Sequence, residues 1–229
     1  MSALVLVVDA ARTGVRAAAV TRDGAVASSA RVEVPVSPGV HGWDEQATDE
    51  LWRATLGAVR GVLDDVDADR LDRVAVTADP RATVLWDRET LGSPRRAVLA
   101  APVEVLPWVA AHEPRTWALV EEGGYAVGGL ESYLVARTTL GTWHVTDPTH
   151  AAAGGLLDPD GGRWSTPACR AAGVPVEALP ELVPSAGHLA TTEARALHGL
   201  ALPVTALLAH DPRATPDERL VLAAAAAHA

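Results

Sequence analysis

The sequence predicts an α/β fold in which a mixed β-sheet is flanked by helices. Three strand-like segments open the chain, at about residues 3–9, 15–21 and 25–34, and the first is almost entirely apolar. An apolar strand of this kind is typical of the centre of a sheet, where both faces are buried. A segment with helical periodicity and a further apolar strand (71–79) follow. A helix therefore connects a three-strand meander to a fourth strand.

The local signals for these elements are turn and cap residues. Arg22-Asp23-Gly24 is a hairpin turn signal, and Thr48 is a candidate helix cap that precedes two acids. The segment 83–100 is interpreted as a hairpin that turns near Leu91-Gly92. Shorter helices are predicted at 105–111, 129–138 and 167–172, a strand at 202–211, and a helix from about residue 216. We find no internal repeat and no long linker, so residues 1–229 are expected to form one domain.

Composition excludes several classes of function. The 229 residues carry a formal net charge of −10, and the longest basic cluster is Arg95-Arg96, which argues against binding to nucleic acid or to an anionic membrane. All 19 basic residues are Arg, so a Schiff base and a P-loop lysine are both excluded. The single Cys169 cannot form an internal disulfide, and no signal segment or membrane-length apolar run is recognised, which predicts a cytoplasmic protein.

Four segments in order resemble the N-terminal domain of the FGGY carbohydrate kinases, the family of glycerol, xylulose and gluconate kinases. They are VVDAARTGVRA, HGWDEQATDELW, VAVTADPRATVLWDRETLGSP and GGLESYLVARTTLGTWHVTDPTHAAAGGLLD. The resemblance implies a ribonuclease-H-like domain of the actin-like ATPase superfamily, with Mg-ATP as a cofactor. It also implies a sugar or polyol substrate. The chain ends about where the second, nucleotide-binding domain of the family would begin, so that domain is expected to be missing.

The resemblance places the phosphate loop at the start of the chain. Asp9 would lie near the magnesium ion, with Thr13 and Arg16 near the nucleotide phosphates, and Arg12 could offer a further charged donor. The family glycine falls on Ala11. If that position required a positive φ, the β-carbon would cost about 1–2 kcal/mol. An alternative interpretation is that Arg12 is a surface residue and that the loop no longer meets a nucleotide.

The sugar-binding residues match the family less well. Trp43 and Glu45 are retained, but the family's Gln-Arg-Glu corresponds to Asp79-Pro80-Arg81. Asp79 and Arg81 could bind hydroxyl groups or could pair with each other. The family's Trp-Gln-Asp corresponds to Ala100-Ala101-Pro102, which has no polar side chain. Each polar group that loses its partner in such a site weakens binding by about 1–3 kcal/mol.

The resemblance puts Asp211 where the family has its catalytic base, although His-Asp-Pro also suits an ordinary turn at the end of a strand. The leading hypothesis is a degenerate, single-domain relative with little or no kinase activity alone, which acts as a binding or interaction module. A homodimer or a separate chain would cover its cleft face. The alternative is an ATP-dependent sugar or polyol kinase whose second half is another chain. A hydrolase built on Asp9, Asp147 and Asp211 is disfavoured, because few carboxylates are available.

Overall fold

A six-stranded mixed sheet forms the centre of the protein, as the sequence predicts. The computed structural model describes residues 3–39 and 42–229. The strand order is β12-β13-β6-β1-β2-β3; β1, β2 and β3 form an antiparallel meander, β6 and β13 run parallel to β1, and β12 is antiparallel to β13. The strands are β1 (Leu4–Ala11), β2 (Gly14–Thr21), β3 (Val26–Glu33), β6 (Leu71–Ala78), β12 (Ala186–Thr191) and β13 (Pro203–Ala209).

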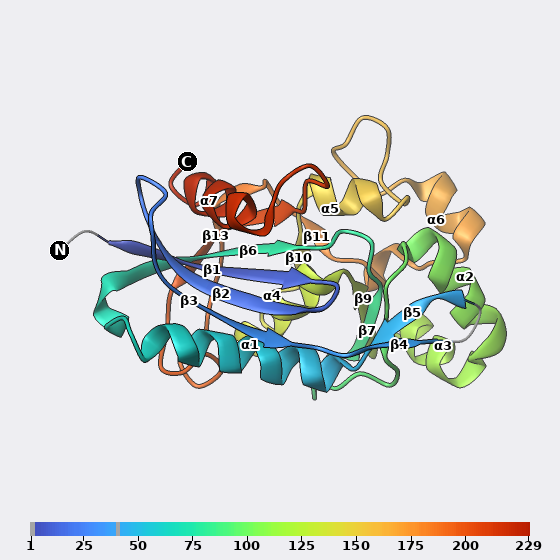
Figure 1. Cartoon of the computed structure of the whole chain (residues 1–229). Coiled ribbons are helices and arrows are strands. Elements are labelled where there is room, and N and C mark those ends of the chain that lie inside the picture. The colour runs from blue at the N-terminus through green and yellow to red at the C-terminus, as the bar shows by residue number, and fades with distance from the viewer. Residues whose placement is uncertain (1–2, 40–41) are drawn as a thin grey trace.

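Helices cover both faces of this sheet, one from each end of the chain (Figure 1). Along β1, Leu4, Leu6 and Val8 belong to the core cluster that includes α1 (Thr48–Leu63). The alternate residues Val5 and Val7 belong to a second cluster with α7 (Pro216–Ala226). Successive side chains of a strand point to opposite faces, so an unbroken apolar run is what a strand between two helical layers requires.

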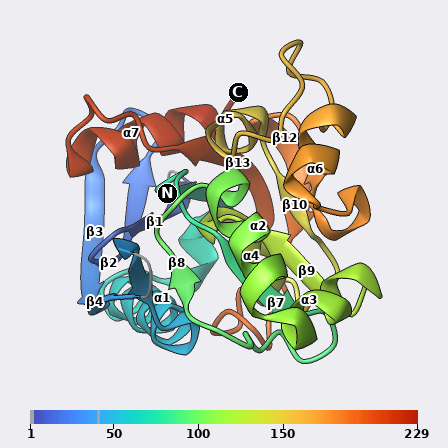
Figure 2. The same cartoon turned by 90° about the vertical axis from the view of Figure 1, so that its right-hand side faces the viewer.

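A smaller lobe lies beside the sheet and has its own apolar core (Figure 2). Its core combines β7 (Val84–Asp87) and β9 (Tyr125–Gly128) with α2 (Pro102–His112), α3 (Pro114–Glu121) and α6 (Thr166–Ala172). The remaining elements are β4 (Val36–Pro38), β5 (Asp44–Gln46), β8 (Ala97–Val98), α4 (Leu130–Thr138), β10 (Val145–Thr146), α5 (Pro148–Ala153), β11 (Glu181–Leu182), η2 (Ala68–Arg70) and η3 (Val176–Ala178).

Two local predictions are wrong. The segment 83–100 does not form a regular hairpin, because β7 pairs with β9 and β8 pairs with β5, leaving only the Thr83–Val98 bridge between its arms. Pairing with β9 and β5, which are distant in sequence, buries both arms, which a free hairpin would not do. Thr48 does not cap α1 either: Ala47 holds the cap position and Thr48 is the first helical residue. The predicted helices at 105–111, 129–138, 167–172 and from 216 are confirmed as α2, α4, α6 and α7.

The parallel strands β1, β6 and β13 end side by side. The Asp79 N–H donates to the Ala10 carbonyl at 3.0 Å, and the His210 N–H donates to the Ala78 carbonyl at 2.9 Å. The residues that follow β6 and β13 are therefore held next to the end of β1. In open α/β sheets the carboxyl edge of parallel strands is the usual place for ligands. None of the helices in the described part of the chain has the length and hydropathy needed to cross a membrane.

Candidate functional site

The turn that joins β1 to β2 is built without a glycine at Ala11. β1 extends through Ala11, Arg12 and Thr13 form a two-residue turn, and Ala11 pairs directly with Gly14. Among the described residues, positive φ outside glycine occurs only at Leu91, Leu140 and His198. Ala11 is therefore an ordinary strand residue, and its β-carbon carries no conformational cost. The glycine that this turn needs is Gly14, because a β-carbon there would lie 2.5 Å from the Val32 carbonyl oxygen.

A cavity of about 320 Å³ lies beside this turn, at the carboxyl edge of the sheet. This volume is within the usual range of small-molecule pockets, about 300–1,000 Å³. Three guanidinium groups and one carboxylate line it, so its charge favours an anion. The lining residues are Asp9, Ala11, Thr13, Gly14, Arg16, Arg31, Pro216 and Arg219.

Asp9 is the acid of this cavity, and both of its oxygens have partners. The side chain is 2% exposed; Oδ1 accepts from His210 Nε2 at 2.6 Å, and Oδ2 accepts from an Arg219 guanidinium nitrogen at 3.1 Å. Because a carboxylate only accepts, the proton of this bond lies on His210 Nε2. His210 comes from the end of β13, and Arg219 comes from the first turns of α7.

A magnesium ion bound at Asp9 does not fit this arrangement. Mg²⁺ prefers carboxylate and water oxygens in an octahedral shell. Here each Asp9 oxygen already accepts a hydrogen bond, and a cation would face three guanidinium groups. Among the residues that the structure describes, no group of three or more His, Cys, Asp or Glu is placed to hold a metal ion. The cavity thus suits a phosphate better than it suits a metal.

Of the other residues that the resemblance assigns to the phosphate loop, two line the cavity and one does not. Thr13 and Arg16 line the cavity with Asp9, and the Thr13 hydroxyl accepts from Arg31 at 3.0 Å. Arg16 donates to Ser29 at 3.2 Å and pairs with Asp217 of α7, whose side chain is largely exposed. Arg12 turns away and pairs with Asp44. Arg12 is therefore a half-exposed residue that does not line the cavity.

Asp211 does not line the same cavity. It is exposed and accepts a hydrogen bond from the Arg213 backbone N–H at 2.8 Å, which is an ordinary Asx turn after a strand. It lines a separate hollow of about 500 Å³ beside α7, together with Asp217 and Glu218. In the position next to Asp9, the structure instead places the neighbouring residue, His210.

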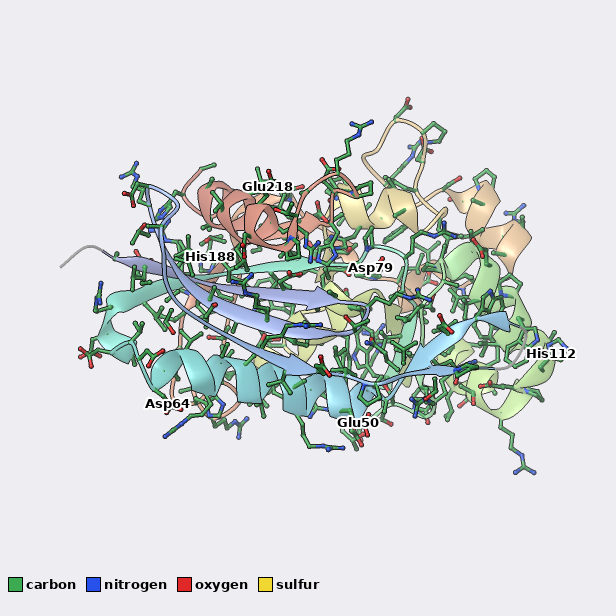
Figure 3. The ribbon with its side chains drawn as sticks, in the orientation of Figure 1. Glu50, Asp64, Asp79, His112, His188 and Glu218 are labelled. Atoms are coloured by element: carbon green, nitrogen blue, oxygen red, sulfur yellow. The ribbon has the colours of Figure 1, made fainter. Side chains whose placement is uncertain are left out.

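Asp79 and Arg81 are held in a turn after β6 and do not pair through their side chains. The Asp79 carboxylate accepts from the Arg81 backbone N–H at 3.0 Å, and the Arg81 guanidinium donates to Glu104 of α2 at 3.2 Å. Figure 3 shows Asp79 at the end of β6, beneath the level of α7 and its Glu218. Both side chains thus take part in local contacts at the edge of the sheet.

Trp43 and Glu45 lie at the smaller lobe. The Trp43 ring meets Trp108 edge to face, with centroids 6.1 Å apart, and packs against the core of that lobe. Glu45 is largely buried and accepts from Arg95 at 3.3 Å. Arg95 also donates to Glu113 at 2.8 Å and lies over the Trp108 ring. These contacts join α2 to β5, which is a structural role.

Sequence reasoning missed Arg31 and Arg219, which line the cavity, and His210, which donates a hydrogen bond to Asp9. A signal existed for His210, because it directly follows a parallel strand and ligand sites gather at such ends. Arg31 is one of several polar residues on an edge strand, and Arg219 lies on a helix with many charged neighbours. Their position follows only from the pairing of β2 with β3 and the packing of α7 on the sheet.

Most of the chain matches a protein-family model. Residues 4–101 and 96–215 match the model of the FGGY family of carbohydrate kinases, N-terminal domain. Among curated proteins, a glycerol kinase of Methylobacterium nodulans is 28% identical, over 94% of this chain and 49% of that protein. A glycerol kinase of Dechloromonas aromatica is also 28% identical, over 92% of this chain and 49% of that protein. The chain spans about half the length of the curated relatives that it matches.

Solved structures show the same fold. The Plasmodium falciparum glycerol kinase, crystallised with ADP, superposes with a TM-score of 0.82 at 16% identity, covering 91% of this chain and 48% of that one. The xylulose kinase of Rhodospirillum rubrum gives a TM-score of 0.79 at 20% identity, covering 90% and 49%. The mixed sheet with its flanking helices is thus the ribonuclease-H-like, actin-like ATPase fold of these kinases.

Proposed function

Because this chain belongs to the FGGY family of carbohydrate kinases, we propose that it binds a phosphate-bearing compound in the cavity at Asp9 and acts as a binding module, with little or no sugar kinase activity alone. One observation carries this proposal: the Asp9 carboxylate is occupied by His210 and Arg219 inside a cavity lined by three arginines. The carboxylate that a metal ion would need instead holds the His210 and Arg219 side chains in place.

Support for phosphate binding comes from the donors around the cavity. Arg16, Arg31 and Arg219 bring planar guanidinium groups, which match the geometry of phosphate oxygens. The Thr13 hydroxyl and the backbone of the β1–β2 turn lie at the same place. A nucleotide such as ADP, or a free diphosphate, has this chemistry.

The contacts of the residues that phosphoryl transfer would need support low kinase activity. Phosphoryl transfer depends on positioning and on neutralising the charge of the transferred group. Asp211 caps its own turn, and residues 100–102 form the apolar start of α2. Asp79 and Arg81 are engaged in local contacts. No described carboxylate of this set is free to take a hydroxyl proton in the cavity.

Binding can be tested by calorimetric titration with pyrophosphate and ADP, each with and without magnesium. We expect both to bind without the metal, and Arg31→Gln to weaken binding about tenfold, as the loss of one charge-assisted contact does. Arg60→Gln is the matched control, because Arg60 is exposed on α1 and pairs with Asp64. Equal affinity of both variants, or binding that requires magnesium, would contradict the proposal.

Turnover is a separate test. Purified protein is incubated with Mg-ATP and a panel of sugars and polyols, and ADP release is measured. We expect no sugar-dependent release above the background. Sugar-dependent turnover that Asp211→Asn abolishes would overturn the assignment as a module with little activity.

A second candidate is an ATP-dependent sugar or polyol kinase whose other half is a separate chain. The favouring observation is that Asp9, Thr13 and Arg16 meet in one cavity, in a fold shared with a glycerol kinase crystallised with ADP. On this hypothesis the partner would cover the hollow beside α7, where Val221 and Leu222 are exposed next to Asp211. Activity that appears on mixing with a chain carrying the second half would establish it. A homodimer found by light scattering, without activity, would instead favour self-association of the same face.

A further inference from the structure

A cavity of about 270 Å³ lies between α1 and α4 and is separate from the Asp9 cavity. Its volume is near the lower end of the usual range for small-molecule pockets, about 300–1,000 Å³. Its walls come from α1, from the turn that follows β7, from α4 and the residues after it, and from the segment between β12 and β13. Because it shares no lining residue with the Asp9 cavity, a ligand here is independent of phosphate binding at Asp9. The wall residues that matter below are Trp52, Leu56, Leu91, Arg137, Leu140 and Arg195.

The charge of this cavity is positive. Arg137 and Arg195 line it, and no described Asp or Glu does. Arg195 is exposed and makes no hydrogen bond or ion pair with any residue that the structure describes. The neighbouring Asp87 carboxylate is occupied within its own turn, where it accepts from the Glu89 N–H and from the N–H and hydroxyl of Thr90. In a chain of net charge −10, two guanidinium groups with no acid in the same wall favour an anionic ligand.

The Arg137 side chain is held in place while part of it stays open. Its Nη1 donates to the Leu91 carbonyl at 3.0 Å and to the Tyr133 hydroxyl at 3.1 Å. Its guanidinium carbon lies 4.9 Å from the centre of the Trp52 ring, which is a cation–π contact. Nε and Nη2 donate to no described residue, and neither belongs to the buried polar atoms that lack a partner, so water reaches both. These two nitrogens form the edge of the planar group that can bind both oxygens of a carboxylate.

The backbone around the cavity holds an uncommon conformation. Leu91 and Leu140, which line the cavity, have φ values of 58° and 52°. His198, with a φ of 50°, donates from Nε2 to the carbonyl of the wall residue Leu56 at 2.9 Å. Among the described residues other than glycine, these three are the ones with left-handed φ. Each costs about 1–3 kcal/mol, and such residues gather at ligand sites, where the surrounding structure holds them. Their grouping here indicates a ligand site.

The apolar walls define the rest of the ligand. Trp52 and Leu91 are buried, and Leu56 and Leu140 are half-buried, so the cavity has an apolar side next to the Arg137 guanidinium. An apolar group that leaves water for this side gains about 25 cal/mol for each Å² that it buries. An inorganic anion has no apolar group and gains nothing there. The cavity thus suits an anion that carries an apolar body.

We propose that this cavity is a binding site for a small organic carboxylate, such as an acid with a single ring. Nε and Nη2 of Arg137 donate to the two carboxylate oxygens, and Arg195 supplies a second positive charge from the segment between β12 and β13. The apolar body of the acid lies against Trp52 and the leucines of the wall. A neutral or cationic compound of the same shape binds more weakly, because the guanidinium groups give it no charge pairing.

The test is a calorimetric titration of the intact chain with benzoate, benzamide and benzylamine, which share one ring and differ in charge. We expect saturable binding of benzoate, and binding of the other two compounds that is weaker by at least about tenfold. In protein with ¹⁵N-labelled arginine, benzoate should move the Nε resonance of Arg137, which locates the site.

Pyrophosphate, the probe for the Asp9 cavity, should leave benzoate binding unchanged. A protein that binds pyrophosphate but not benzoate overturns this inference alone and leaves phosphate binding at Asp9 intact. Displacement of benzoate by pyrophosphate would instead show that the two ligands do not have separate sites, which also overturns it.

Variants of the two arginines complete the experiment. Arg195→Gln removes an exposed charge that has no described partner, and we expect it to weaken benzoate binding about fivefold. Arg170→Gln is the matched control, because Arg170 is an exposed arginine of α6 outside the cavity, and it should bind as the parent does. Arg137→Met should abolish binding. If Arg137→Met does not fold, Arg195→Gln and the three compounds still decide. Equal benzoate binding by Arg195→Gln and the parent, or equal binding of benzamide and benzoate, overturns the proposal.

Discussion

His210 Nε2 donates to Asp9 Oδ1 at 2.6 Å, and these residues are 201 positions apart in the chain. This bond joins the end of β13 to the end of β1, and Arg219 of α7 binds the other Asp9 oxygen. The acid near the end of β1 is therefore a structural junction between the first and last parts of the sheet. Its role in stability can be measured separately from any role in binding.

We expect Asp9→Asn to lower the free energy of unfolding by about 3 kcal/mol, because it leaves Arg219 partly buried without its counter-charge. Urea denaturation measures this change. The matched control is Asp211→Asn, which removes an exposed acid at the end of β13 and should cost no more than about 0.5 kcal/mol. Equal stability of the two variants would show that Asp9 is not a junction.

Gly14→Ala should be destabilising, by about 1–3 kcal/mol, although the chain tolerates Ala11 nearby. A β-carbon at Gly14 would lie 2.5 Å from the Val32 carbonyl oxygen, so β2 and β3 would have to separate. Thermal unfolding of Gly14→Ala is compared with that of Gly162→Ala, where the added carbon meets no atom within 4 Å. A Gly14→Ala protein as stable as the control would contradict the close approach of these strands.

The Arg95 network should contribute to stability through charge pairing. Arg95 is 10% exposed and lies between Glu45 and Glu113, so Arg95→Met removes the partner of Glu113 and leaves Glu45 only its longer pair with Arg96, at 3.9 Å. We expect a loss of about 2–4 kcal/mol in urea denaturation. Arg60→Met, at an exposed pair on α1, is the control and should change stability by no more than about 0.5 kcal/mol. If Arg95→Met were neutral, the packing over Trp108 and not the charge would hold this region.

His144 predicts a dependence of stability on pH. Burial, together with the charge of Arg88, lowers its pKa to about 4. The unfolded chain takes up this proton near pH 6.5, whereas the folded protein does not. The free energy of unfolding should therefore fall as the pH falls from about 6.5 to about 4, by about 3 kcal/mol for this residue.

The contribution of His144 is isolated by subtracting the stability of His144→Gln, measured by urea denaturation at each pH. Glutamine can still donate to Val127 and accept from Arg88, but it does not titrate. Relative to that of the variant, the free energy of unfolding of the parent protein should decrease as the pH falls through this range. A difference that is constant with pH would show that the native histidine is protonated normally.

His150 acts in the opposite direction. Burial alone would lower its pKa, but the neighbouring Glu131 and Asp147 carboxylates raise it, so its contribution is present at low pH and is lost only as the pH rises through that value.

The sequence alone determined the meander, the helix α1, the order of the main elements and the family, because these depend on local periodicity and on motifs read in series. It also placed Asp9, Thr13 and Arg16 in one loop, and they do line one cavity. It could not show that β7 pairs with β9 and not with β8, because β8 and β9 are both short apolar strands.

Only the tertiary structure decided what surrounds Asp9. His210 and Arg219 reach it because β13 lies parallel to β6 and α7 packs across β1, contacts that span most of the chain. The same is true of Arg137 and Arg195, which share a cavity only after α4 and the segment between β12 and β13 are packed beside α1. Local sequence fixes which groups a segment carries. Long-range packing decides which of these groups share a buried site. Burial matters because the free energy of a paired or an unpaired charge is larger away from water.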